Sequence, residues 1–420
     1  MEILSTGEKI KRARIYKGIT LKELCKDKIS ISKMSCIEND KIVPEQWILE
    51  IISETLDLDI NYLIQNDEYQ LHEYIKKAEK LEKRKLDVEE LKYYIEYAES
   101  KEYYKEAFKL IHILVLVYME HRDFASISNI FYKYYGAYEK NLELSKIFFE
   151  DISKYFFKTE QYREALMYLE RLYIYLMEQN IIYDDINYYG NLKVFEGKCY
   201  YYLNNFEKLN MIIEEIKQIF PNVTDTKLEG KIYALSILLN PKILYEDRSK
   251  YNKMEECLKD NKVILAKVKF NIALSFFQFG DKDEALKEID EALSAINKDN
   301  NEEYVEFLLK VIKTLIGNNE INKSKILCDE ACDIAIELDN IRLVEKAYYF
   351  KGIVSRILGD FTQGEMYMNL STDALMKFGN KKEKYDRYLE MANMYHVIGD
   401  LRDSLRYFTL AMRLEKIMNN

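Results

Sequence analysis

Apolar residues recur three and four positions apart along most of this chain, which is the spacing of one face of an α-helix. The 420 residues include only three prolines and thirteen glycines, so few positions interrupt the pattern. The chain is therefore predicted to be all-α. Its length exceeds that of one ordinary hydrophobic core, which favours two domains or an extended array of repeats.

Turn-like junctions between amphipathic segments recur at intervals of 36 to 45 residues, which indicates an internal repeat. Each junction ends one predicted helix and precedes another, so the repeating unit is a helical hairpin of about forty residues. Stacked hairpins bury a continuous core and leave a concave face lined by the first helix of each pair. The junctions are marked by His121, Thr159, Asn204, Asn240, Gly280, Gly317, Gly359 and Gly399.

The clearest repeats, residues 265–297 and 385–417, resemble the tetratricopeptide (TPR) repeat. In both, a Gly-Asp pair stands before the second helix, at 280–281 and 399–400. Ala273 and Ala392 occupy the small-residue position of the first helix, and Ala285 that of the second. Small side chains at these positions allow two helices to pack closely. The resemblance implies a TPR-like α-solenoid over residues 91–420. Residues 67–90 are strongly charged with sparse apolar positions, which predicts a linker helix before it.

Before the repeats, residues 20–41 predict two short helices joined by a tight turn. Thr20 precedes Glu23 by three positions, so the first of these helices opens with a capping box. The second opens at Ser30 or Ser32 and ends near Glu38. This arrangement is the helix-turn-helix pattern, which places its second helix in the major groove of DNA.

Residues 1–66 also resemble the lambda-repressor-like (Xre) helix-turn-helix family. The resemblance implies that Arg14 pairs with Glu38 as part of the scaffold. The chain departs from the family at Leu21, at Cys25, at Asp40 where glycine usually ends the recognition helix, and in the turn around residues 27–28, which looks one residue short. The residues that carry the resemblance are Ile10, Arg14, Gly18, Thr20, Leu24, Ser35, Ile37, Glu38, Asn39 and Pro44.

The distribution of charge favours DNA binding at one end of the chain. The net charge is −10, yet residues 1–41 hold ten Lys or Arg against six acidic residues. A basic head on an acidic body confines contact with DNA to that head. A small helical bundle used for protein contact is the alternative. The candidate DNA-binding residues are Thr20, Lys22, Ser30, Ser32, Lys33, Cys36, Asn39 and Lys41.

The sequence does not favour an enzyme, a cofactor or a metal site. The four histidines are scattered, and Cys328 and Cys332 lack nearby metal-binding partners, so core packing is the simpler interpretation. No glycine-rich phosphate loop is present. Six cysteines without a CxxC pair and the lack of an apolar amino-terminal segment predict a cytoplasmic protein without a membrane segment.

Counting back from the repeat turns places polar residues on the concave face. An asparagine amide matches the donors and acceptors of an extended peptide, and lysine or arginine can bind a carboxylate. The alternative is that these side chains only solvate the surface or bond a neighbouring helix. The candidate peptide-binding residues are Lys198, Tyr201, Tyr349, Arg356, Asn393 and His396.

Taken together, an Xre-like head, a linker helix and hairpin repeats resemble the peptide-pheromone-responsive regulators of low-GC Gram-positive bacteria, the Rgg/PrgX/PlcR/NprR group. The resemblance implies a homodimeric transcription factor that binds operator DNA and is controlled by a short signalling peptide in quorum sensing. Two alternatives stay open. One is a TPR-type interaction scaffold with a weak or vestigial DNA-binding head, and the other is a relay inhibitor that acts through protein contact.

Overall fold

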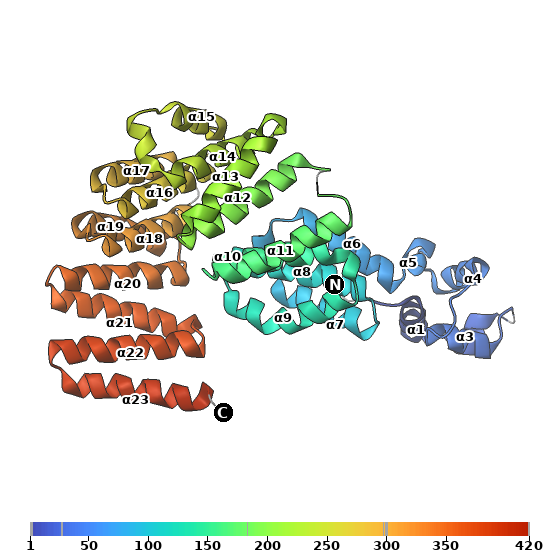
Figure 1. Ribbon diagram of the computed structural model, residues 1–420. Helices are drawn as coiled ribbons and strands as arrows, with labels where there is room; N and C mark the ends of the chain where they lie inside the picture. Colours follow the sequence, from blue (N-terminus) through green and yellow to red (C-terminus); the bar gives the residue numbers. More distant parts are fainter. Residues whose placement is uncertain (1–2, 27, 183, 297, 299–300, 419–420) are drawn as a thin grey trace. The chain divides into compact units, whose positions relative to one another are not determined.

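The computed structural model describes residues 3–26, 28–182, 184–296, 298 and 301–418. Over these residues the chain is helical and no strand forms (Figure 1), which confirms the predicted all-α class. The chain divides into two compact units, Met1–Asp185 and Ile186–Asn420. The division falls within the segment expected to form one repeat domain, and the amino-terminal head belongs to the same unit as the first hairpins.

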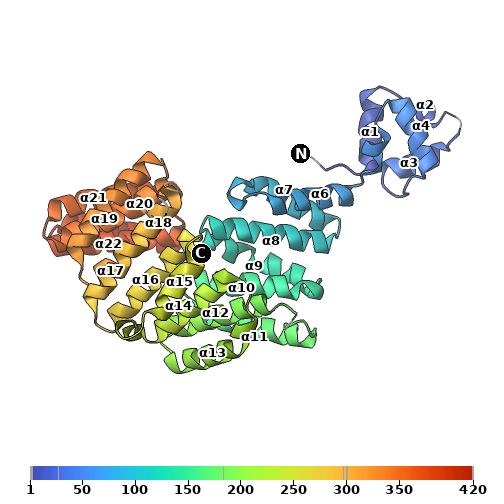
Figure 2. The ribbon, with the colours of Figure 1, turned by 90° about the horizontal axis from the view of Figure 1, so that it is seen from above.

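Five short helices form the head, and Figure 2 shows them grouped together at the start of the chain. Ile10, Leu24 and Met34 are fully buried in its core, as the three-and-four spacing predicts. The helices are α1 (Thr6–Tyr16), α2 (Leu21–Cys25), α3 (Ile31–Glu38), α4 (Gln46–Leu56) and α5 (Ile60–Ile64).

The remainder of unit 1 consists of longer helices that pair along the chain. Where one linker helix was expected over residues 67–90, the structure has α6, a 3-10 turn and the start of α7. A new helix begins there because the Asp87 carboxylate accepts hydrogen bonds from the amides of Glu89 and Glu90. The elements are α6 (Asp67–Lys80), η1 (Lys83–Lys85), α7 (Val88–Ser100), α8 (Tyr104–Glu120), α9 (Phe124–Glu139), η2 (Leu142–Leu144), α10 (Ser145–Lys158) and α11 (Tyr162–Glu178).

Helix α6 joins the head firmly to the repeats. It buries Leu71 and Ile75 and contacts α8. At its start, the Asp67 carboxylate accepts hydrogen bonds from the hydroxyls of Tyr97, at 3.1 Å, and Tyr103, at 3.2 Å. These contacts explain why the chain does not divide between the head and the first hairpin.

Unit 2 is a stack of helical hairpins, and Figure 1 shows its helices lying one against the next. Each helix pairs with its neighbour in sequence, and α14 also contacts both α12 and α16. The elements are α12 (Ile186–Tyr202), α13 (Phe206–Ile219), η3 (Phe220–Asn222), α14 (Thr226–Leu239), η4 (Pro241–Tyr245), α15 (Ser249–Leu258), α16 (Lys262–Gln278), α17 (Lys282–Ala295), α18 (Asn301–Gly317), α19 (Ile321–Glu337), α20 (Ile341–Ile357), α21 (Phe361–Phe378), α22 (Lys381–Ile398) and α23 (Leu401–Met418).

The repeat turns follow one backbone pattern, which accounts for the junctions seen in the sequence. In most hairpins a residue in the left-handed conformation follows the first helix, and the second helix begins two residues later. Glycine adopts this conformation without steric cost at three of these turns. At Asn240 the backbone is extended instead, and η4 intervenes before the next helix. The left-handed turn residues are Arg122, Glu160, Asn204, Gly280, Asn319, Gly359 and Gly399.

The small-residue positions of the TPR-like pattern lie in the packed interior. Ala273 and Ala285 are fully buried, and Ala392 is nearly so. Close helix packing at these positions agrees with the steric argument made from the sequence. The predicted TPR-like helical-repeat fold is therefore confirmed.

Candidate functional sites

Two predicted DNA-binding residues of the head define where its motif helices begin. The Thr20 hydroxyl accepts a hydrogen bond from the Glu23 amide, and the Glu23 carboxylate accepts one from the Thr20 amide at 2.7 Å. Ser30 caps α3 by accepting from the Lys33 amide at 3.1 Å. Of the two predicted starting points for this helix, Ser30 is therefore the one used.

A buried ion pair holds the motif helix α3 against α1. The Arg14 guanidinium binds the Glu38 carboxylate through two hydrogen bonds, of 2.6 and 2.9 Å, and a third reaches the carbonyl of Ile19. Glu38 is almost fully buried, and the pair raises the pKa of Arg14. This is the scaffold pair that the resemblance implies, and it fixes the orientation of the exposed face of α3.

Asp40, which replaces the usual glycine after the recognition helix, has a structural role. Its backbone is left-handed, with φ of +53°, a conformation that aspartate tolerates better than most residues. Its carboxylate accepts hydrogen bonds from the Gly7 amide, at 2.9 Å, and from the Ser5 hydroxyl. This departure from the family therefore ties the end of α3 to the start of α1. Asp27, in the turn that looks one residue short, lies outside the described residues.

The remaining candidate DNA-binding residues lie on or beside α3. Ser32, Cys36 and Asn39 share one face because they are four and three positions apart. Ser32 and Asn39 are exposed and Cys36 is half-buried. The Asn39 amide donates a hydrogen bond to the carbonyl of Ser35 in its own helix. Outside this face, Lys33 forms an ion pair with Glu45 at 2.9 Å, whereas Lys22 and Lys41 are exposed.

The structure disperses the predicted peptide-binding residues of unit 2. Tyr201 is buried in the core, where its hydroxyl bonds that of Ser275 at 2.7 Å, so its placement on the ligand face is wrong. The helix turns Tyr201 toward the packed side even though Lys198, three positions earlier, reaches a pocket. Counting positions along one helix from the sequence does not show which residues face the packed core and which face a pocket.

The other predicted residues lie on α20 and α22. The Tyr349 hydroxyl donates to the Glu390 carboxylate at 2.8 Å, and its ring lies 4.5 Å from the Arg387 guanidinium. The Nε atom of Arg356 is buried without a hydrogen-bond partner. Asn393 and His396 are exposed on α22. These residues do not share a pocket with Lys198 among the described residues.

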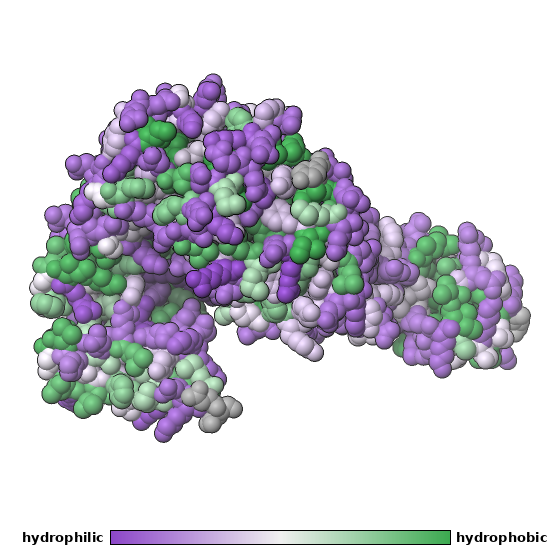
Figure 3. Space-filling model, viewed as in Figure 1, coloured by the Kyte–Doolittle hydropathy of each residue, from purple (hydrophilic) through white to green (hydrophobic). Residues whose placement is uncertain are grey.

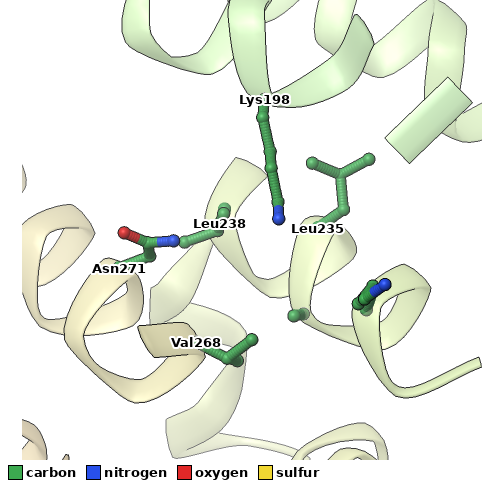
Figure 4. A pocket seen from close by; sticks show the side chains of 7 residues that line it. Lys198, Leu235, Leu238, Val268 and Asn271 are labelled. Carbon is green, nitrogen blue, oxygen red and sulfur yellow. The ribbon is translucent and has the colours of Figure 1, made fainter. Parts of the chain in front are cut away.

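A small pocket in unit 2 gathers polar groups that the sequence analysis missed. Lys198 from α12, Lys231 from α14 and Asn271 from α16 line it together with four apolar side chains. Figure 4 shows the Lys198 amine pointing into the space between Leu235, Leu238 and the α16 residues. The cavity volume is about 10 Å³, which is room for one water-sized atom. The apolar lining residues are Ala234, Leu235, Leu238 and Val268.

The electrostatics of this pocket are unusual because no described carboxylate forms an ion pair with either of its lysines. Burial, followed by the charges of Lys231 and Lys310, lowers the pKa of Lys198 to about 8. The Lys231 amine donates to the Asn191 side-chain oxygen at 3.0 Å, and burial lowers the pKa of Lys231 as well. Desolvated cations without a paired acid attract an anion, which makes this pocket the strongest candidate ligand site in unit 2.

Two other kinds of site are not found in the described part of the chain. No group of three or more His, Cys, Asp or Glu side chains is arranged to hold a metal ion. None of the described helices combines the length and apolar character needed to cross a bilayer.

No family model matches the chain, and no curated protein matches it in sequence. Among solved structures it resembles the apo form of the quorum sensor NprR from B. thuringiensis, with 16% identity over 84% of this chain and 99% of that chain and a TM-score of 0.41. The apo form of RapI is similar over 62% of this chain and 74% of that chain, with 17% identity and a TM-score of 0.44. A third is PlcR of Bacillus thuringiensis, solved in complex with the peptide PapR7 and DNA, with 14% identity over 95% of this chain and 99% of that chain and a TM-score of 0.20.

Proposed function

We propose that this protein is a sequence-specific DNA-binding transcriptional regulator controlled by a short signalling peptide, acting in the cytoplasm. The observation that carries the proposal is the head. Its two motif helices are capped, its Arg14–Glu38 pair fixes α3, and Ser32 and Lys41 face solvent on or just after that helix. Such a helix can enter the major groove, with lysines on the phosphates and short polar side chains at base edges.

The regulator acts as a homodimer in this proposal, because paired helix-turn-helix heads match half-sites roughly 34 Å apart or a multiple of that distance. The end of the repeat array offers an apolar surface for the contact. Exposed apolar residues gather at successive turns there, and Figure 3 shows them as green patches over α20–α23. The residues are Ile357, Leu358, Phe361, Val397, Ile398, Leu401 and Leu405.

The peptide binds unit 2 in this proposal, with Lys198 as one of its contacts. A solenoid of hairpins accumulates small rotations, so a ligand that bridges successive first helices can alter the geometry of the array. A coupling of about 1–3 kcal/mol gives a 5- to 150-fold change in operator affinity. Native mass spectrometry of protein isolated from its own host tests this part, and a small peptide adduct is the expected result.

A gel-shift assay with the chain's own upstream region, at salt concentrations between about 50 and 200 mM, tests the DNA-binding part. The Lys41→Ala variant is expected to weaken binding and to reduce the salt dependence by about one phosphate contact. Lys80→Ala is the matched control, because Lys80 is an exposed lysine of the same unit outside the motif. Retardation no stronger than that of unrelated DNA contradicts the proposal.

A second candidate function is an interaction scaffold with a vestigial head. It is favoured by the internal use of two predicted DNA contacts, since Lys33 pairs with Glu45 and the Asn39 amide bonds its own helix. The same gel-shift assay separates the two functions. A scaffold gives identical, non-specific binding for the unaltered chain and for Lys41→Ala.

A further inference from the structure

We propose that Lys198, Lys231 and Asn271 together bind a carboxylate of the ligand. The inference rests on the proposed function and deepens it by naming the chemistry of the ligand. The three residues come from three successive first helices of unit 2, so a bound carboxylate bridges α12, α14 and α16.

The donors of this pocket have unused capacity. The Lys198 amine makes no hydrogen bond to any described residue, although it carries three N–H donors. The Lys231 amine uses one donor on the Asn191 oxygen, and it forms no ion pair with a described residue. The Asn271 oxygen accepts from the Tyr202 hydroxyl at 3.1 Å, which leaves the amide N–H groups to donate. The pocket therefore presents donors and positive charge, and none of its described lining residues is acidic.

The shape of the pocket favours a carboxylate over a phosphate. The cavity admits one water-sized atom, and most of its lining residues are apolar. One carboxylate oxygen fits that volume, and its partner oxygen remains at the mouth. A phosphate dianion places more oxygens at the same site, and the aliphatic walls of Leu235, Leu238 and Val268 offer them no donors. A carboxylate can place one oxygen against the donors and keep the other outside the aliphatic walls.

Selective labelling of lysines in the full chain tests the inference. N-hydroxysuccinimidyl acetate acetylates unprotonated amines, and mass spectrometry reports the rate at each lysine. The probes are N-acetyl-leucine, N-acetyl-leucinamide, the α-amide of N-acetyl-glutamate and inorganic phosphate. We expect N-acetyl-leucine to slow acetylation of Lys198 several-fold at pH 8, and N-acetyl-leucinamide to leave it unchanged. Lys227, an exposed lysine of the same helix as Lys231, is the internal control.

The other probes distinguish the source of the carboxylate. Protection by the glutamate derivative as strong as that by N-acetyl-leucine assigns the pocket to an acidic side chain, and weaker protection assigns it to a free carboxyl terminus. Three outcomes overturn the inference: N-acetyl-leucine and N-acetyl-leucinamide protect Lys198 equally, only phosphate protects it, or no probe protects it. In Lys231→Met the protection of Lys198 is expected to fall, whereas in Lys227→Met it is expected to persist.

The pH dependence gives a second readout. Binding requires the protonated amine, and the pKa of Lys198 without ligand is about 8. Affinity for N-acetyl-leucine is therefore expected to fall about tenfold for each pH unit above 8. The groups that act on this amine are Lys231, Lys310 and Cys199.

The labelling assay involves no DNA, so it tests the carboxylate site separately from the regulator function. Protection of Lys198 without operator binding contradicts the proposed regulator function but supports the carboxylate site. Operator binding without protection supports the regulator function but contradicts the carboxylate site.

Discussion

Lys198 and Lys269 lie on first helices of hairpins in the same unit, yet their surroundings are opposite. The Lys269 amine contacts the carboxylates of Glu255, at 2.5 Å, and Glu291, at 2.6 Å, and the hydroxyl of Tyr251, at 2.7 Å. These acids outweigh its burial and raise the pKa of Lys269. The Lys198 amine has no acidic partner among the described residues, and its pKa is lowered to about 8.

Lys193 shows that Lys198 is the exception in its own helix. The Lys193 amine lies 3.0 Å from the Glu196 carboxylate and 2.7 Å from that of Glu215, and its pKa is raised to about 12. Lysines with a structural role in this unit are thus accompanied by acids from neighbouring helices. A partly buried lysine without such an acid costs folding free energy, which is the pattern expected where a ligand supplies the missing anion.

The largest expected effect comes from removing the paired lysine. Lys269→Met leaves Glu255, Glu291 and the buried Glu288 without their cation, so we expect a loss of about 3–5 kcal/mol in the free energy of unfolding. Urea denaturation followed by circular dichroism measures it. Lys267→Met is the matched control, because Lys267 pairs with Glu303 near the surface of the same helix and should leave the midpoint unchanged. Equal midpoints for the two variants would mean that the buried ion pairs of Lys269 stabilise the fold no more than a surface pair does.

Glu288 beneath Lys269 gives the next largest effect. It is fully buried, one of its oxygens has no hydrogen-bond partner, and burial raises its pKa from 4.5 to about 7. Because the folded-state pKa lies above the unfolded one, stability is greatest below pH 4.5 and falls as the pH rises to 7. The expected loss is about 3 kcal/mol.

Denaturation at pH 5 and pH 8 checks this expectation with two variants. Glu288→Gln should lose less stability between these pH values than the unaltered chain, because its amide cannot ionise. Glu256→Gln, at an exposed position of α15, should keep the full pH dependence. A pH response that is the same in all three proteins refutes the assignment to Glu288.

The repeat architecture could be predicted because it depends on local signals. Gly280, Gly359 and Gly399 mark turns whose left-handed backbone favours glycine, and the same spacing fixes the hairpins between them. The Arg14–Glu38 pair was likewise expected, because a resemblance to a known family supplied both partners. Features that depend on one short segment, or on a known pattern, were therefore accessible.

The pocket around Lys198 was largely inaccessible from sequence, because three separate helices form it. Lys198 was a candidate on its own, and Lys231 and Asn271 join it through the packing of α12, α14 and α16. Tyr201 was misplaced because counting along one helix does not say which side the next hairpin covers. Asp40 was noted only as a departure, since the partners that give it a role lie more than thirty residues earlier.

The smallest expected effect tests the comparison of Lys198 with Lys269 most directly, because removing Lys198 should stabilise the protein whereas removing Lys269 should destabilise it. Lys198→Met removes a cation whose pKa falls from 10.5 to about 8 on folding, so the variant is expected to be more stable at pH 7 by about 2 kcal/mol, after a discount for the water that reaches the amine. The folded-state pKa lies below the unfolded one, so the advantage is full below pH 8 and disappears as the pH rises toward 10.5. Denaturation at pH 7 and pH 10 measures both values, with Lys227→Met as the control. A destabilised Lys198→Met variant would mean that the amine has a partner in the free protein, and the contrast with Lys269 would then be lost.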